Sequence, residues 1–180
     1  MASIYKIAME SPNQVPAPAY VALGSNLGDS RQIILEAMAR LALLSGIRIK
    51  QSSLWQTSPV DCPPGSPKFI NAVVAIVPRM GETPESFLEK LLALEKEFGR
   101  RPKQVLNEPR PLDLDLIAFG NATCQTERVS LPHPRAHLRR FVLQPLSEIA
   151  PDFVLPGQEK SVSKLLAALP TTERVERIVV

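Results

Sequence analysis

The sequence has few of the features that mark secreted, membrane-spanning or nucleic-acid-binding proteins. It contains two cysteines, Cys62 and Cys124, whose spacing matches no disulfide framework, so we expect free thiols in a reducing compartment. No run of about 18 apolar residues occurs, which argues against a membrane span. The N-terminus has no basic segment followed by an apolar run, so we expect no signal peptide and a cytoplasmic location.

Motifs of common nucleotide and zinc sites are also missing. Neither G-x-x-x-x-G-K-[ST] nor G-x-G-x-x-G occurs, so a nucleotide would have to bind without a phosphate loop. The two histidines, His133 and His137, have no cysteine or carboxylate near them in sequence to complete a zinc ligand set. The formal net charge of +3 is too small to argue for nucleic acid. The basic residues gather in two short stretches, 100–110 and 135–140, which favours a local anionic ligand.

Proline is abundant, and its positions indicate how the chain is organised. Eighteen of the 180 residues are proline, gathered at 12–18, 59–67, 102–111 and 132–134, which we interpret as loops. We expect residues 1–18 to be a flexible extension. We expect residues 19–180 to form a single domain, because a chain of this length suits one hydrophobic core.

Hydrophobic periodicity predicts an α+β fold. Short apolar or alternating runs predict strands at 19–24, 47–55, 69–77 and 112–119. Helical spacing predicts one helix over 33–44, capped by Asn26 or Asp29, and a second that begins at Thr83 and Pro84 and ends at Gly99. This β-α-β-β-α-β order is typical of a ferredoxin-like antiparallel sheet with both helices on one face. A C-terminal extension follows, with irregular chain over 128–138, helices near 139–149 and 161–169, and a strand-like tail over 175–180.

The most informative motif is Pro109-Arg-Pro-Leu-Asp-Leu-Asp-Leu-Ile117. Alternate side chains of a strand share a face, so Asp113 and Asp115 point the same way, with Cα atoms roughly 6–7 Å apart. Two carboxylates at that separation suit a pair of metal ions that assist displacement at phosphorus. Oxygen ligands favour Mg²⁺. The alternative interpretation is two aspartates on the solvated face of an amphipathic strand, although aspartate disfavours strands.

Three further residues stand out from their surroundings. Arg110 lies between two prolines beside the aspartates and suits a phosphate, whereas Arg101 and Lys103 separately fit a solvated loop better. His133, also between two prolines, is placed to donate a hydrogen bond to a phosphate oxygen. Asn71 interrupts an apolar strand and must find partners, which are either structural or the polar edge of a heterocycle.

Six motifs in order resemble those of the hydroxymethyldihydropterin pyrophosphokinase family, from about residue 19 to 155. They are Gly24-Ser-Asn-Leu-Gly, Phe69-Ile-Asn-Ala, Glu95 to Gly99-Arg100, Pro109-Arg-Pro-Leu-Asp-Leu-Asp, Pro132-His-Pro-Arg and Arg139-Arg-Phe-Val-Leu-Gln-Pro-Leu-Ser-Glu-Ile-Ala-Pro151. The family has a ferredoxin-like α+β fold, which agrees with the predicted order of elements.

The resemblance implies a reaction and a role for particular residues. The hydroxyl of 6-hydroxymethyl-7,8-dihydropterin would attack the β-phosphorus of ATP, and AMP would leave. Two Mg²⁺ ions would be held by Asp113 and Asp115, and Arg100 and Arg110 would stabilise charge during transfer. The other implied contacts are with the nucleotide (Glu95, His133, Arg139, and Leu116 against the adenine) and with the pterin (Thr57, Val60, Phe69, Asn71 and Phe141). No nucleic acid or membrane partner is implied; a monomer is expected, with an oligomer left open.

The chain departs from the family in the loop before Asp113, at Pro102, Leu106, Asn107 and Glu108. In the family this loop closes over the substrates, and Glu108 beside a triphosphate would repel it. A homologue that binds pterin or nucleotide without turnover is therefore one alternative. A non-enzymatic ferredoxin-like module that binds RNA is the other, but it would need exposed aromatic residues on the central strands and a stronger basic face.

Overall fold

The computed structural model describes residues 17–59, 62, 64–101, 108–171 and 173–178. The strands are β1 (Ala19–Ser25), β2 (Lys50–Gln51), β3 (Trp55–Thr57), β4 (Phe69–Ile76), β5 (Asp113–Phe119), β6 (Cys124–Gln125), β7 (Ser130–Leu131) and β8 (Val175–Arg177). The helices are α1 (Ser30–Ala42), α2 (Pro84–Glu97), the short 3-10 helix η1 (Ala136–Leu138), α3 (Arg140–Ile149) and α4 (Val162–Ala168). Among the described residues, every helix is too short or too polar to cross a bilayer.

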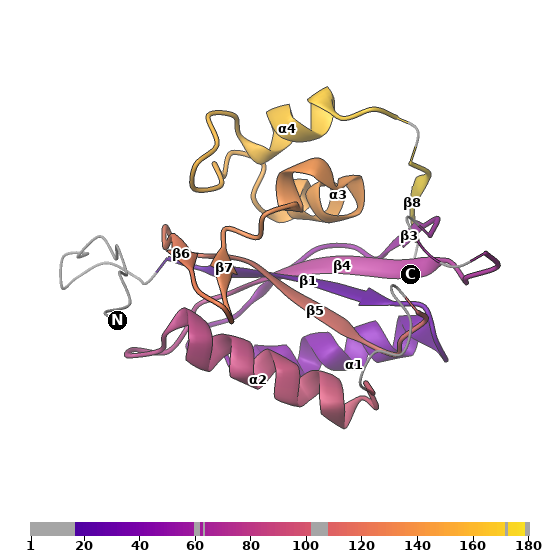
Figure 1. Cartoon of the computed structure of the whole chain (residues 1–180), viewed down its shortest axis with the longest axis horizontal. Coiled ribbons are helices and arrows are strands. Elements are labelled where there is room, and N and C mark those ends of the chain that lie inside the picture. Colours follow the sequence, from indigo (N-terminus) through magenta and orange to yellow (C-terminus); the bar gives the residue numbers. More distant parts are fainter. Residues whose placement is uncertain (1–16, 60–61, 63, 102–107, 172, 179–180) are drawn as a thin grey trace.

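Within the described residues, the main sheet has the strand order β5-β1-β4-β3-β8, with β2 also paired to β4 (Figure 1). Every pairing in it is antiparallel, which confirms the predicted antiparallel α+β architecture. The second sheet is the hairpin formed by β6 and β7.

The strand predicted over 47–55 is wrong in its detail, because the chain forms two short strands there. Between the pairs Gln51–Val74 and Trp55–Asn71, the segment from β2 to β3 has three residues, whereas β4 has two. Ser52 fills the irregularity: its Oγ accepts a hydrogen bond from the Val73 backbone N–H at 2.9 Å. An extra residue in one strand interrupts the ladder and bends the strand, and an alternating sequence pattern does not reveal it.

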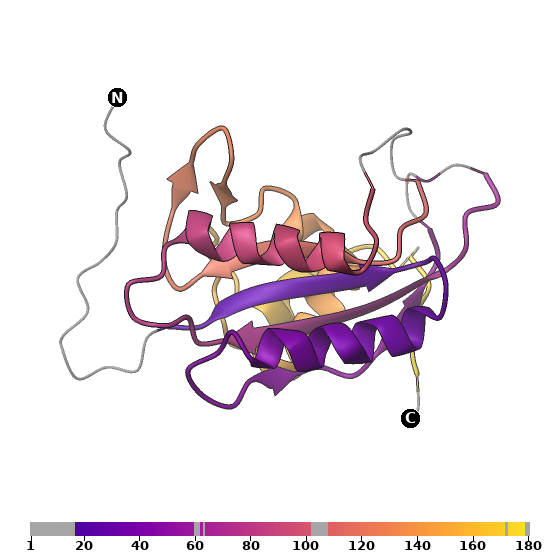
Figure 2. The same cartoon turned by 90° about the horizontal axis from the view of Figure 1, so that it is seen from below.

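The two predicted helices, α1 and α2, lie side by side under one face of the sheet (Figures 1 and 2). They bury a large core that includes Leu23, Ile34 and Phe87. Of the two predicted caps for α1, the structure uses Asp29, whose side chain accepts a hydrogen bond from the Gln32 N–H at 3.1 Å. The start predicted for α2 is confirmed, with Thr83 as its N-cap and Pro84 in its first turn.

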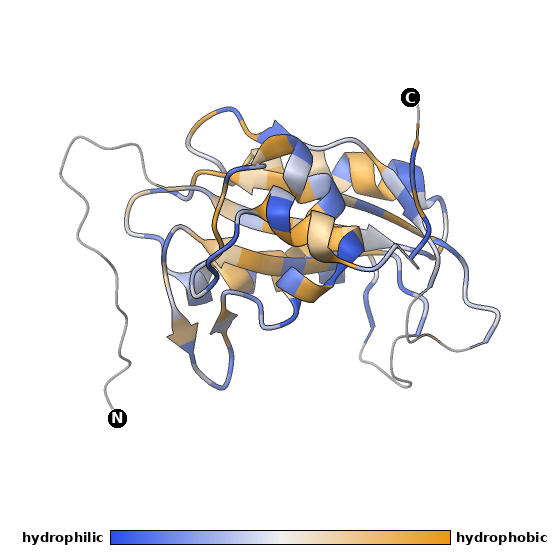
Figure 3. Ribbon diagram, turned by 90° about the horizontal axis from the view of Figure 1, so that it is seen from above, coloured by the Kyte–Doolittle hydropathy of each residue, from blue (hydrophilic) through white to orange (hydrophobic). Residues whose placement is uncertain are grey.

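The C-terminal extension covers the opposite face of the sheet with α3 and α4 (Figures 1 and 3). A second core lies between these helices and the sheet and includes Tyr20, Val73, Ile117 and Leu143. Strands β1 and β4 are apolar on both faces, and a strand with two apolar faces must be covered twice. The tail then returns to the sheet, where β8 pairs with β3.

Candidate active site

Strand register places the candidate residues on one face of the sheet. Asp113 lies beside Gly24, Gly24 beside Asn71, and Asn71 beside Trp55, so these four residues form a row across four strands. Paired residues of adjacent strands share a face. The next row on that face, Asp115–Ala22–Val73, runs into the core under α3. The site therefore lies on the α3 face of the sheet, beside the core that α3 covers.

A pocket of about 370 Å³ opens on this face. Ten of the thirteen residues predicted for the site line it. The complete lining is Ala22, Leu23, Gly24, Thr57, Ser58, Cys62, Phe69, Asn71, Arg100, Arg110, Asp113, Asp115, His133, Arg135, Leu138, Arg139, Phe141 and Glu173.

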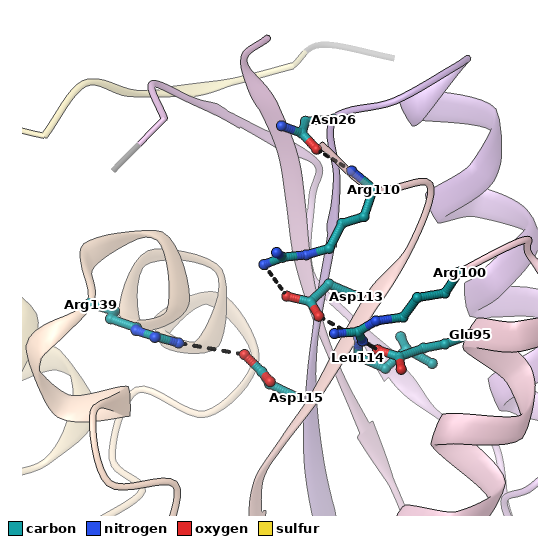
Figure 4. A network of polar contacts seen from close by, with 8 residues as sticks. All are labelled: Asn26, Glu95, Arg100, Arg110, Asp113, Leu114, Asp115 and Arg139. Atoms are coloured by element: carbon teal, nitrogen blue, oxygen red, sulfur yellow. Dashed lines mark hydrogen bonds and ion pairs between the residues drawn. The ribbon is translucent and has the colours of Figure 1, made fainter. Parts of the chain in front are cut away.

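Asp113 lies between two guanidinium groups (Figure 4). One of its oxygens is 2.9 Å from Arg100, and the other accepts a hydrogen bond from Arg110 at 2.6 Å. Arg100 also contacts Glu95, which is almost fully buried on α2 and accepts the Leu114 backbone N–H at 2.7 Å. Burial raises the pKa of Glu95 to about 7, although Leu114 and Arg100 act in the opposite direction. Glu95 thus joins α2 to the strand that carries the aspartates.

The Gly24-Ser-Asn-Leu-Gly motif positions Arg110. Asn26 Oδ1 accepts the Arg110 backbone N–H at 2.9 Å, and the Asn26 backbone N–H donates to the Arg110 carbonyl at 3.2 Å. The sequence indicated only a turn and a helix cap here. Gly24 has a role of its own, because a Cβ at this position would lie 3.2 Å from Asn71 Oδ1 and 3.9 Å from Asp113 Cβ.

Asp115 faces His133 and Arg139 rather than Arg100. Arg139, just before α3, donates from a guanidinium nitrogen 3.5 Å from an Asp115 oxygen (Figure 4). Burial and the nearby Asp113 raise the pKa of Asp115, while His133, Arg139 and Arg110 oppose the rise. Burial lowers the pKa of His133, against the effect of Asp115. The loop that carries His133 is held by its own N–H, which donates to the Ile117 carbonyl at 2.9 Å.

Beside these charged residues, which we call the basic half of the pocket, the lining is aromatic and amide in character. Asn71 donates from Nδ2 to Thr57 Oγ1 at 2.7 Å, and both side chains are buried. Phe69 lies under the Arg110 guanidinium at 5.9 Å, and Phe141 lies under that of Arg139 at 5.4 Å. A flat polar ring between the phenylalanines and Asn71 would therefore border the basic half of the pocket.

Three predicted residues do not line the pocket, each for a different reason. Leu116 is 6% exposed and belongs to the core under α1 and α2, because it alternates with Asp115 along β5. Glu95 lies behind the lining and reaches the pocket through Arg100. Val60 lies outside the described residues, as do the atypical Pro102, Leu106 and Asn107 and the predicted extension up to residue 16.

The sequence did not single out four of the lining residues that carry polar or thiol groups. Arg135 belongs to the basic stretch 135–140, so that cluster was a signal that could have found it. Ser58 and Cys62 follow Thr57 in the proline-rich loop. Glu173 comes from the segment before β8, and nothing in its local sequence indicates a site.

The carboxylates suit a hard cation that takes most of its ligands from elsewhere. Among the described residues, no three His, Cys, Asp or Glu side chains gather at one point to hold a metal. Mg²⁺ is characteristically held by one or two carboxylates together with substrate phosphates and waters. Asp113 and Asp115 fit that pattern, and they do not fit a structural zinc site.

Comparisons with known proteins show which family the chain resembles. Residues 20–151 match the family described as 7,8-dihydro-6-hydroxymethylpterin-pyrophosphokinase. The chain is 38% identical over 169 residues to the 2-amino-4-hydroxy-6-hydroxymethyldihydropteridine pyrophosphokinase of Synechocystis sp., covering 92% of this chain and 85% of the relative. It is 39% identical over 160 residues to the protein of the same name from Methylorubrum extorquens, covering 88% and 98%.

Solved structures resemble the chain in fold. A crystal structure of HPPK-DHPS in complex with substrates superposes with a TM-score of 0.67 at 14% identity, covering 85% of this chain and 43% of that one. Wild-type Plasmodium falciparum HPPK-DHPS with pteroate gives a TM-score of 0.65 at 14% identity, covering 88% and 43%. This chain thus spans less than half the length of those two chains.

Proposed function

The chain belongs to the 7,8-dihydro-6-hydroxymethylpterin-pyrophosphokinase family, and we propose that it transfers the pyrophosphoryl group of ATP to the hydroxymethyl group of 6-hydroxymethyl-7,8-dihydropterin. The products are AMP and the pterin diphosphate, and the step belongs to folate biosynthesis. The observation that carries the proposal is one pocket that brings Asp113 and Asp115 together with basic side chains, two phenylalanines and the Asn71 amide.

The basic half suits the triphosphate of ATP. Arg100, Arg110, Arg135 and Arg139 all line the pocket together with His133. Arg110 Nε is buried and has no hydrogen-bond partner within the described ranges of the chain. A buried donor without a partner is costly, and a phosphate oxygen would satisfy it. In this assignment Arg100 and Arg110 stabilise the charge that develops during transfer, and Arg139 and His133 hold the nucleotide.

The aromatic–amide half suits the pterin. Phe69 and Phe141 would flank the ring, and Asn71, fixed by Thr57, would pair with its polar edge. Gly24 leaves space for the ring beside Asn71 and Asp113. The hydroxymethyl group would then point toward the aspartates, and the β-phosphorus would approach from the basic side. Positioning and fixed charge supply most of the rate enhancement in such transfers.

Two Mg²⁺ ions, held by Asp113 and Asp115, would draw charge from the phosphate oxygens when bound. In the ligand-free protein Asp113 is instead neutralised by Arg100 and Arg110. With the ions bound, Asp113 would no longer need both guanidinium groups as counter-charges, and Arg100 and Arg110 would be available to the phosphate oxygens. Glu95 would limit how far Arg100 moves, because it contacts Arg100 and is itself anchored to Leu114.

The order of strands and helices supports the ferredoxin-like fold expected for this family. The strands β1, β3, β4 and β5 are ordered β5-β1-β4-β3, with α1 following β1 and α2 following β4. This arrangement supports the ferredoxin-like topology, with α3, α4 and β8 as the additions to it.

Product analysis tests the proposal. The protein is mixed with ATP, Mg²⁺ and 6-hydroxymethyl-7,8-dihydropterin, and the nucleotide products are separated. We expect AMP and the pterin diphosphate in wild type, and loss of both without Mg²⁺ or in Asp113→Ala. Asp152→Ala removes an exposed aspartate outside the pocket lining and should leave the products unchanged. ADP as the product would contradict attack at the β-phosphorus, and pterin binding without turnover would indicate a homologue that has lost catalysis.

A further inference from the structure

The C-terminal tail brings a carboxylate to the pterin half of the pocket. We propose that Glu173 is a specificity-determining residue that accepts hydrogen bonds from the 2-amino and ring N–H groups of the pterin; this inference rests on the proposed function. The family match ends at residue 151, so Glu173 is a contribution of this chain from outside the matched segment.

The pairing of β8 with β3 brings the segment that carries Glu173 beside Thr57, a residue predicted to bind the pterin. In the pairing of β3 with β8, Thr57 lies opposite Val175, and the Ser58 N–H donates to the Arg174 carbonyl at 3.3 Å. Opposite residues of paired strands share a face, so Val175 lies on the face of Thr57. Glu173 is two residues before Val175, and both Thr57 and Glu173 line the pocket.

One oxygen of the half-buried Glu173 side chain is a buried acceptor without a donor. Glu173 Oε2 is buried and has no hydrogen-bond partner in the described part of the chain. Leaving a buried acceptor unsatisfied costs free energy, so such groups are normally paired. The same segment offers a contrast: Glu176 is exposed and pairs with Arg174 at 2.8 Å. The unsatisfied oxygen therefore marks Glu173 as an acceptor for something that enters the pocket.

The pterin supplies the matching donors. The substrate named for the relatives carries a 2-amino group and a 4-hydroxy group, and in the keto form the 2-amino group lies beside a ring N–H. These two donors point the same way, like two N–H groups of a guanidinium, and a carboxylate accepts both at once. An ATP phosphate would be repelled by Glu173. This favours the pterin as the ligand that meets it.

Calorimetry with wild type, Glu173→Gln and Glu176→Gln tests the inference. Each protein is saturated with Mg²⁺ and a non-hydrolysable ATP analogue and then titrated with the pterin or with an analogue that lacks the 2-amino group. We expect Glu173→Gln to weaken pterin binding at least tenfold, with unchanged affinity for the ATP analogue and a Tm no lower than that of wild type. Glu176→Gln should match wild type. The analogue should bind wild type at least tenfold more weakly than the pterin, and Glu173→Gln should reduce that preference.

Each outcome decides between the two claims. Pterin binding within twofold of wild type in Glu173→Gln, with normal turnover in wild type, would overturn the role of Glu173 and leave the proposed function standing. Equal affinity of wild type for the pterin and the analogue would overturn it as well, independently of how the variant folds. A wild-type protein that neither binds nor converts the pterin would refute both.

Discussion

The buried carboxyl of Glu95 gives a quantitative test of the site's electrostatics. Replacing Glu95 with Gln keeps the size of the side chain and removes the titration. Glu95 is 1% exposed, and burial raises its pKa from 4.5 to about 7. The unfolded chain therefore releases this proton at lower pH than the folded protein does. The folded state binds more protons between these two pKa values, so the free energy of unfolding falls as pH rises through them.

The pKa difference sets the size of the effect. One pKa unit corresponds to about 1.4 kcal/mol. Integrated from about pH 5 to about pH 8, the Glu95 titration removes about 2–3 kcal/mol of stability from the wild-type protein. The stability of wild type relative to Glu95→Gln should decrease by that amount over this range.

Urea unfolding of the metal-free proteins measures this difference, with fluorescence of the single tryptophan, Trp55, as the signal. Glu97→Gln is the matched control, because it removes a carboxylate of the same helix that pairs with Arg40 at the surface. Parallel pH dependence in wild type and Glu95→Gln would refute the reasoning. It would mean that the Arg100 and Leu114 contacts fully offset the cost of burying the charge.

Three further substitutions separate binding, catalysis and stability. Gly24→Ala should weaken pterin binding about tenfold, measured by calorimetry, because the new methyl group crowds Asn71. Thermal unfolding should show a stability within about 1 kcal/mol of wild type. Asn26→Ala removes the acceptor for the Arg110 N–H and should lower kcat about tenfold with little change in pterin Kd, whereas an unchanged kcat would show that Arg110 needs no anchor. Asp29→Ala removes the α1 cap and should cost about 1 kcal/mol of stability with unchanged kcat; equal Tm values would contradict the capping role.

The local features of the protein were readable from the sequence because neighbouring residues encode them. Apolar runs located β1 and β4, and helical spacing located α1 and α2. Thr83 marked the start of α2, whereas the start of α1 was left between Asn26 and Asp29. Alternation along β5 put Asp113 and Asp115 on one face. The order of these elements then predicted the antiparallel sheet. The break between β2 and β3 was missed, because a bulge changes the register without changing the composition.

Only the tertiary structure decided which of these residues meet. Asn26 and Arg110 are 84 residues apart in sequence, and Glu95 reaches Leu114 from another element. Glu173 enters the pocket because β8 pairs with β3. Short-range patterns specify a face or a cap, since they depend on dihedral angles and neighbouring side chains. Contacts between distant segments depend on sheet register and on how each segment packs, and these are settled by burial of the whole core.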